Sequence, residues 1–404
     1  MTMNRRETLA IAPMLTALAL GSHSQVASAA TTTEVKIDPY NQTPEQEARH
    51  AVRLPKLDQQ SVQDFLSSTR ASLGKEFRPM RGILEKALAE KGIAMDADMS
   101  QEQAWTTLMQ HPMYAMNARI WMSTQQQMWS NIYGIFHENA DTILAELEKA
   151  DKSGPGRLEL NPNMDLPAYT RHEIHIQPGG YVGDPFAGAI SHYGFKQFDR
   201  NVFKNDRMEH HLAMAMETPI PADGKVRRIL DMGTGFGAFA TSLKERFPDA
   251  EVWGVDVGGP MVRWAHYRAV KMGLDVNFAQ RLAEDTKFED GYFDVVVSYI
   301  LHHEVQPDVH EKIVREAYRV LRPGGSYFPV DFVTKGNPRY MGAPDLMRKA
   351  SIWQDHRWNT EVWSPAYRET DFPEIMRKTG FVDMKVSAKT GTAFQDVYGF
   401  KPLA

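Results

Sequence analysis

A glycine-rich turn preceded by an acidic residue is the part of the sequence best suited to hold a ligand. Residues 229–238 read ILDMGTGFGA. Asp231 stands two positions before the first of three glycines at alternate positions, Gly233, Gly235 and Gly237. Glycine lets the backbone turn tightly and lets a ligand approach the next helix N-terminus, where unpaired N–H groups favour anionic or electron-rich atoms. Because the spacing also fits a looser dinucleotide-binding pattern, the turn alone leaves the ligand open.

A second carboxylate is expected at the tip of the neighbouring strand. Asp256 ends the apolar run that follows the turn and its helix. A carboxylate there can accept hydrogen bonds from both hydroxyls of a ribose, which neither an amide donor nor a lysine can do. Further along, residues 282–294 form a loop able to present backbone groups and a carboxylate to an adenine edge.

Two consecutive histidines follow the fourth expected strand, where a cleft would open. His302 and His303 carry imidazoles, which titrate near neutral pH and suit a general base acting on a hydroxyl or phenol. The alternative is that one of the pair caps the turn and packs in the core. Asp331 and His211 are further candidates for the same role.

The sequence predicts no metal site. The chain contains no cysteine, which excludes disulfides, thiolate metal ligands and cysteine nucleophiles. His172 and His175 could bind a metal together with a nearby carboxylate, since imidazole is a common ligand. Their spacing within a glycine-rich segment does not by itself indicate such a site, so we expect a lid or a substrate wall there.

The elements that must position these residues alternate between short strands and amphipathic helices. This alternation is typical of a doubly wound α/β fold with a mostly parallel sheet. We expect strands at 226–231, 251–256, 276–279, 293–298 and 325–331, with helices at 236–246 and 309–321. The candidate side chains at strand ends then share one rim of the sheet, where ligands bind in open parallel sheets.

Taken together, residues 226–331 resemble a class I S-adenosylmethionine-dependent methyltransferase of the ubiquinone/menaquinone-type, small-molecule branch. The resemblance rests on the acidic-glycine turn, on Asp256, on the loop after the third strand and on the RVLRPGG run at 319–325, and it extends from Val226 to the C-terminus. It implies a Rossmann-like sheet of seven strands whose last strand, near 392–401, is antiparallel.

The resemblance also implies S-adenosyl-L-methionine as the cofactor. It assigns the ribose to Asp256 and the adenine to Ala283 and Glu284, and it assigns the methionine end of the cofactor to Asp231, Gly233, Gly235 and Gly237. The chain departs from the family at Leu282, where an acidic residue is common, and at Pro329, which removes a donor from the fifth strand.

We divide the chain into four parts. Residues 1–29 are expected to be a signal peptide, 30–152 an N-terminal helical subdomain, 153–224 a connector or lid, and 225–404 the methyltransferase domain. The leader has an arginine pair at Arg5 and Arg6, an apolar run and a small-residue end, which resembles a twin-arginine signal. This pattern predicts an exported, periplasmic protein; a general-secretion leader and a cytoplasmic protein are the alternatives.

Composition favours a small-molecule substrate. The 404 residues are 42% hydrophobic and 24% charged, with a net charge of −5, which excludes a disordered tail and a basic surface for nucleic acid. The Met- and Trp-rich stretch at 105–136 and the aromatic insertion at 336–370 can line an apolar acceptor pocket or fill a core. The first option predicts a hydrophobic or aromatic acceptor.

The sequence therefore predicts a methyltransferase that acts on a small acceptor, without a nucleic-acid partner or a stable membrane span. A homodimer is left open. Two alternatives stand beside this reading: an exported, non-catalytic binding protein on the same scaffold, and a dinucleotide-dependent oxidoreductase.

Overall fold

The computed structural model describes residues 32–39, 41–43, 54–77, 79–199, 207–388 and 394–403. The chain from Thr32 to the C-terminus forms one compact unit. The expected leader, 1–29, lies outside the described residues, so the twin-arginine signal stays a prediction.

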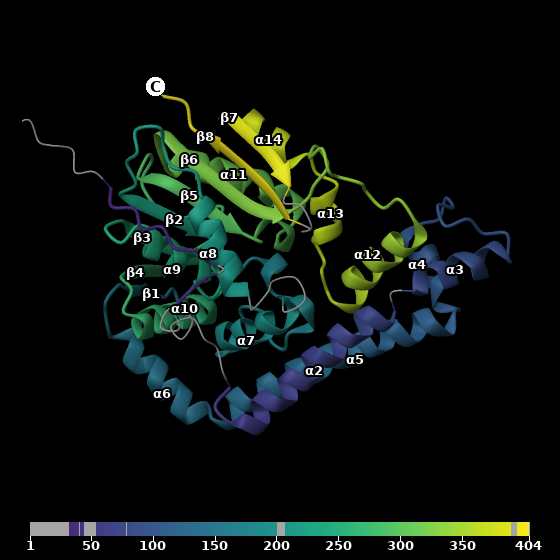
Figure 1. Cartoon of the computed structure of the whole chain (residues 1–404). Coiled ribbons are helices and arrows are strands. Elements are labelled where there is room, and N and C mark those ends of the chain that lie inside the picture. Colours follow the sequence, from purple (N-terminus) through teal and green to yellow (C-terminus); the bar gives the residue numbers. More distant parts are fainter. Residues whose placement is uncertain are drawn as a thin grey trace, which may run out of the picture. The chain divides into compact units, whose positions relative to one another are not determined.

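One mixed sheet organises the described chain (Figure 1). Its strand order is β1-β4-β3-β2-β5-β6-β8-β7, with parallel pairing from β1 to β6. Strand β8 is antiparallel to both β6 and β7. The strands are β1 (Leu158–Glu159), β2 (Arg228–Met232), β3 (Glu251–Asp256), β4 (Val276–Gln280), β5 (Phe293–Tyr299), β6 (Leu321–Phe332), β7 (Val382–Ala388) and β8 (Phe394–Phe400).

The predicted α/β class and the antiparallel last strand are confirmed. All five expected strands are present, although β6 begins four residues earlier than expected, at Leu321. The expected count of seven strands is wrong by one, because two residues of the connector, Leu158–Glu159, add β1 to the free edge of β4. Pro329 is tolerated in β6 because pairing with β8 is interrupted there, between Tyr327 and Val330.

Both faces of the sheet are covered by helices, as a doubly wound sheet requires. Successive side chains of β5 alternate between the two hydrophobic cores: Val295 and Val297 enter one, and Val296 enters the other. Helices α8 (Arg207–Glu217), α9 (Ala238–Arg246) and α10 (Gly259–Met272) pack into the first core, and α11 (Pro307–Val320) and α14 (Phe372–Thr379) pack into the second.

Helices dominate the N-terminal part, as expected. Helix α5 is the longest of them; His111 caps its start by accepting a hydrogen bond from the Met113 N–H, and Pro112 occupies the first turn, where no N–H is needed. The helices are α2 (Leu57–Glu76), α3 (Met80–Ala89), α4 (Gln101–Met109), α5 (Pro112–Glu138) and α6 (Ala140–Asp151). None of the helices in the described ranges is long and apolar enough to cross a lipid bilayer.

The aromatic insertion after β6 packs against these helices. Helix α12 (Leu346–Trp358) lies beside α4 (Figure 1), and the Trp353 ring stacks on Trp105 with centroids 4.2 Å apart. The aromatic residues of this insertion, all of them described, are absent from the lining of the cavity at the glycine turn: Tyr340, Trp353, Trp358, Trp363 and Tyr367. Tyr367 is buried in the core, and the other four are half-buried.

The connector contains more regular structure than its turn-rich sequence predicts. Beside the short turns η1 (Ala168–Thr170) and η2 (Ile174–Ile176), it forms α7 (Ala187–Asp199) and α8. Helix α7 enters a third core with α5 and α10. The apolar spacing of Phe186, Ala189 and Ile190 was the signal for this helix. The short α13 (Ser364–Arg368) contacts η3 (His302–Glu304).

One of the glycines of the turn has a packing role that a variant can test. Gly237 has φ +76°, and a Cβ there would lie 2.8 Å from the Ala265 Cβ and 2.9 Å from the Phe278 ring. We expect Gly237→Ala to lower the free energy of unfolding by about 2–4 kcal/mol, from the left-handed backbone and from overpacking.

Gly224→Ala is the matched control, because Gly224 has φ +68° and open space around it. Only the backbone cost of about 1–2 kcal/mol applies there. Urea unfolding of both variants measures the difference, and equal losses would show that the contact with Ala265 and Phe278 is unimportant.

Candidate functional site

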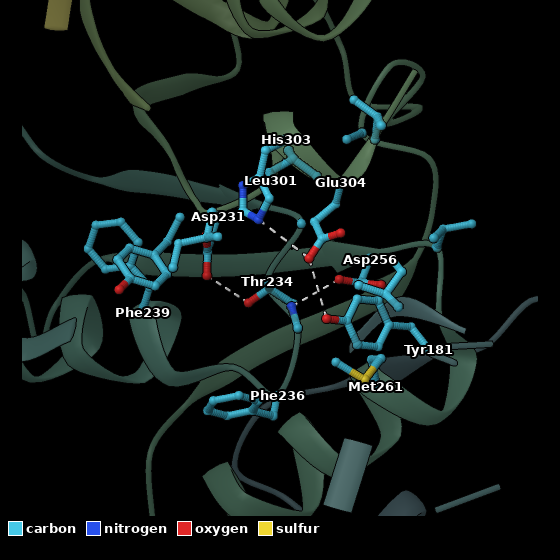
Figure 2. Close-up of a pocket in the computed structure, with 18 of the residues that line it drawn as sticks. Tyr181, Asp231, Thr234, Phe236, Phe239, Asp256, Met261, Leu301, His303 and Glu304 are labelled. Carbon is cyan, nitrogen blue, oxygen red and sulfur yellow. Dashed lines mark hydrogen bonds and ion pairs between the residues drawn. The ribbon is translucent and has the colours of Figure 1, made fainter. Parts of the chain in front are cut away.

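A cavity of about 440 Å³ opens at the carboxyl ends of the central strands (Figure 2). Its walls combine the acidic-glycine turn after β2, the tip of β3, the loop after β4 and the turn after β5. Of the residues expected in the cofactor site, six line this cavity: Asp231, Gly233, Gly235, Asp256, Ala283 and Glu284. The structure thus brings them together at one rim.

Asp231 is buried with one oxygen satisfied and one without a partner. Its Oδ2 accepts hydrogen bonds from the Thr234 hydroxyl at 2.7 Å and from the Ala240 N–H at 3.1 Å. Its Oδ1 is buried and has no hydrogen-bond partner among the described residues. Burial raises the pKa of Asp231 to about 7. An unsatisfied buried carboxylate oxygen is costly, and a cationic donor in the cavity would satisfy it.

Asp256 ties the glycine turn to the next loop. Its Oδ2 accepts from the Gly235 N–H at 2.9 Å, and its Oδ1 accepts from the Gly258 N–H at 2.8 Å. Burial raises the pKa of Asp256, against the lowering effect of these two hydrogen bonds. Each carboxylate oxygen keeps further acceptor capacity, so Asp256 can receive hydroxyl donors from a ligand while it holds the turn.

Gly237 lies elsewhere in the turn. It is the residue before α9 and does not belong to the lining of the cavity, so the structure gives it the packing role described above. Gly233 and Gly235 do line the cavity.

The loop after β4 supplies a third carboxylate. Leu282, Ala283 and Glu284 all line the cavity. The Tyr169 hydroxyl, from η1 of the connector, donates to Glu284 Oε1 at 2.6 Å. Sequence analysis missed Tyr169, since nothing in its local pattern shows that the connector reaches this loop.

The two expected histidines have different surroundings. His303 lines the cavity, and its Nδ1 lies 2.7 Å from Asp331 Oδ1. His302 is fully buried outside the cavity lining, with its Nε2 3.0 Å from the Tyr327 hydroxyl. Burial lowers the pKa of His302 to about 3, so this ring stays neutral. Asp331 also accepts from the His302 N–H at 2.8 Å, which fixes the turn that aims His303 into the cavity.

His303 and Asp331 form a buried ion pair. Burial acts to lower the pKa of His303, but the carboxylates of Asp331 and Glu304 outweigh it and raise the pKa. Burial acts to raise the pKa of Asp331, and His303 reverses that effect. Both groups therefore favour their charged forms in the unliganded cavity.

The lining also contains many aromatic side chains. His211 lines the cavity, and its ring lies 4.4 Å from the Tyr299 ring, centroid to centroid. Five phenylalanines belong to the same lining: Phe195, Phe236, Phe239, Phe332 and Phe394. The cavity thus combines the carboxylates of Asp231, Asp256 and Glu284 with a largely apolar, aromatic surface.

Known proteins resemble the part of the chain that carries this rim. Residues 229–325 match the family described as "Methyltransferase domain". A demethylmenaquinone methyltransferase of Thermus thermophilus is 42% identical over 106 residues, which are 26% of this chain and 47% of the relative. The ubiquinone/menaquinone biosynthesis C-methyltransferase UbiE of Pasteurella multocida is 27% identical over 192 residues, which are 42% of this chain and 69% of the relative.

The chain spans about half the length of most of these curated relatives. Among solved structures, a putative O-methyltransferase of Nostoc punctiforme is 18% identical, covers 52% of this chain and 61% of its own, and superposes with a TM-score of 0.40. The match at 229–325 coincides with β2 to β6 and with the residues of the rim. Residues 229–325 are therefore similar to a methyltransferase domain, and they carry most of the parallel strands and most of the rim.

Proposed function

We propose that the chain transfers a methyl group from S-adenosyl-L-methionine to a small hydrophobic or aromatic acceptor. The observation that carries this proposal is that Asp231 and Asp256, on either side of the glycine turn, line one cavity together with many aromatic side chains. The expected cofactor-binding residues other than Gly237 all line that cavity.

The acidic end fits the cofactor chemically. The unpartnered Oδ1 of Asp231 suits the ammonium of a methionine moiety, and the oxygens of Asp256 suit the two ribose hydroxyls. Ala283 and Glu284 would border the adenine. When bound, the cofactor supplies a methyl group on a positively charged sulfur.

The same charges argue against a dinucleotide. A pyrophosphate on the glycine turn would lie beside Asp231 and Asp256, whose buried carboxylates repel it when ionised. A cationic ligand gains from these carboxylates instead.

The protein's contribution to methyl transfer is mostly positioning. An in-line displacement is accelerated when the two reactants are held close together and aligned. The carboxylates of the rim would hold the donor. Aromatic side chains of the lining, such as Phe239 and Tyr299, would hold an apolar acceptor and exclude water. This aromatic lining supports a hydrophobic acceptor.

We assign the expected base role to His303. It faces the cavity, and Asp331 orients its ring through Nδ1. Its Nε2 lies 3.5 Å from Glu304 Oε1, so an acceptor hydroxyl would replace this contact in order to reach the base. Accepting the proton requires the neutral ring, which a second positive charge in the cavity would favour by like-charge repulsion. His302 is buried outside the cavity lining and serves the core.

Export through the twin-arginine-like leader belongs to the proposal as well. It rests on the sequence, since the leader lies outside the described residues.

Removal of the Asp256 carboxylate should weaken cofactor binding. Asp256→Ala deletes two ribose contacts to a charged acceptor, worth about 1.5–3 kcal/mol each, so we expect the Kd for S-adenosylhomocysteine to rise by about a hundredfold or more. Isothermal titration calorimetry measures this Kd. Glu289→Ala, which removes an exposed carboxylate near the adenine loop, is the control and should bind normally. Unchanged affinity in Asp256→Ala would remove the ribose assignment.

The raised pKa of Asp231 predicts pH-dependent binding. Because this pKa lies at about 7, the carboxyl is mostly protonated at pH 5.5 and about half ionised at pH 7. A ligand ammonium binds the ionised form better, so affinity for S-adenosylhomocysteine should rise roughly tenfold between these pH values. Asp231→Asn should bind weakly at both. A flat profile in the unsubstituted protein would show that Asp231 does not contact the ammonium.

Methyl transfer itself is tested by a metabolite screen with a labelled methyl donor, followed by kinetics on the acceptor found. His303→Asn should lower kcat by about a hundredfold, the lower range for loss of a general base, while the Kd for S-adenosylhomocysteine changes less than twofold. His172→Asn alters a histidine outside the cavity lining and should keep full activity. Absence of any labelled product, despite cofactor binding, would favour the non-catalytic binding protein.

A further inference from the structure

A cluster of three ionisable side chains lies beside the cavity, and one of them, Glu304, also contacts the proposed base, with its Oε1 3.5 Å from His303 Nε2. His175 comes from η2, Glu304 from η3 and Glu361 from the segment after α12. One nitrogen of His175 and one oxygen of each carboxylate lie within 4.8 Å of one another. His175 and Glu304 line the cavity, and Figure 2 shows Glu304 directed at the same space as His303 and Tyr181.

The contacts within this cluster leave one carboxylate oxygen unused. Glu361 Oε1 lies 2.8 Å from His175 Nδ1, and His175 Nε2 lies 3.8 Å from Glu304 Oε1. Glu361 is only 4% exposed, and its Oε2 has no hydrogen-bond partner among the described residues. A buried carboxylate oxygen without a partner is costly, so this atom points to a ligand that the protein alone does not supply.

The backbone holds the cluster in place. His175 and Ile176 both have positive φ, 56° and 53°. The His175 carbonyl accepts from the Trp129 indole N–H at 2.7 Å, and the Ile176 N–H donates to the Thr360 hydroxyl at 3.0 Å. Thr360 is the neighbour of Glu361 in the sequence. The segments that carry two of the three side chains are therefore fastened to each other before any ligand binds.

We propose that His175, Glu304 and Glu361 bind one divalent transition-metal ion with coordination positions open to the cavity. Bonds of about 2.0–2.2 Å place neighbouring ligand atoms about 3.0–3.5 Å apart, so rotation of the two glutamates is enough to close the present spacing. One imidazole and two carboxylates suit Mn²⁺, Fe²⁺ or Zn²⁺ better than a thiolate-preferring metal.

The open positions have a direct use if the proposed methyl transfer is correct. They face the cavity beside His303, so an oxygen atom of the acceptor could coordinate the ion there. This use rests on the proposed function; metal binding itself does not, and it is measured without cofactor or acceptor.

The test is metal binding by the full chain after treatment with a chelator and removal of the chelator. Titration calorimetry with MnCl₂ and with ZnCl₂ should give one ion per chain, and the bound Mn²⁺ should change its electron paramagnetic resonance spectrum. We expect Glu361→Gln and Glu304→Gln each to weaken binding by at least tenfold, since each substitution removes one anionic ligand. Glu284→Gln, at the adenine end of the same cavity, is the matched control and should bind the metal normally.

Circular dichroism shows whether each variant is folded. Glu304→Gln serves if Glu361→Gln does not fold, because its side chain is more exposed, at 13% against 4%. Absence of stoichiometric binding to the unsubstituted chain would overturn the proposal, and so would equal affinity in the folded glutamine variants. Neither result would change the methyltransferase assignment, which rests on Asp231, Asp256 and the match of residues 229–325.

Discussion

The hydrogen bonds that the Asp256 carboxylate receives from Gly235 and Gly258 are the constraint on which the site depends. They join the turn after β2 to the turn after β3. The sheet places these two turns side by side, and the hydrogen bonds hold them together as one rim of the cavity. The parallel register of β2 and β3 makes this possible, because Asp231 pairs with Gly254 and brings both strand ends to the same level. The cavity is therefore shaped before a ligand enters, which reduces the ordering cost of binding.

Burial gives this rim its chemical character. Asp231, Asp256 and Asp331 are all buried or nearly so, and each is stabilised by backbone N–H groups, by Thr234 or by an imidazole. Such groups interact strongly with an incoming charge because little water screens them. The aromatic side chains of the lining have the opposite preference. A ligand that is cationic at one end and hydrophobic beside it satisfies both.

The sequence was sufficient for the parts of this account that depend on local patterns. Alternating apolar runs predicted the five strands, and the position of Asp231, Asp256 and Glu284 just after strands predicted that they would meet, because parallel strands end at one rim. Gly237 follows the same spacing as Gly233 and Gly235, which line the cavity, but its missing side chain makes room for Ala265 and Phe278. Helix α7 and the additional strand β1 were not predicted, because both lie in a segment rich in turn residues.

Contacts between distant segments could not be predicted. His175, Glu304 and Glu361 come from three separate segments, and only the folded chain places them together. The same is true of the Tyr169 contact with Glu284 and of the stacking of Trp105 on Trp353. A single sequence contains no signal for such pairs.

We propose that Asp231 binds the ammonium of S-adenosyl-L-methionine and that Asp256 binds its ribose hydroxyls within one cavity. The most direct measurement is a crystal structure of the chain with S-adenosylhomocysteine. The account predicts the ligand's ammonium within hydrogen-bond distance of Asp231 Oδ1 and both ribose hydroxyls on the Asp256 carboxylate. A ligand bound elsewhere, or bound with these two carboxylates uninvolved, would contradict it.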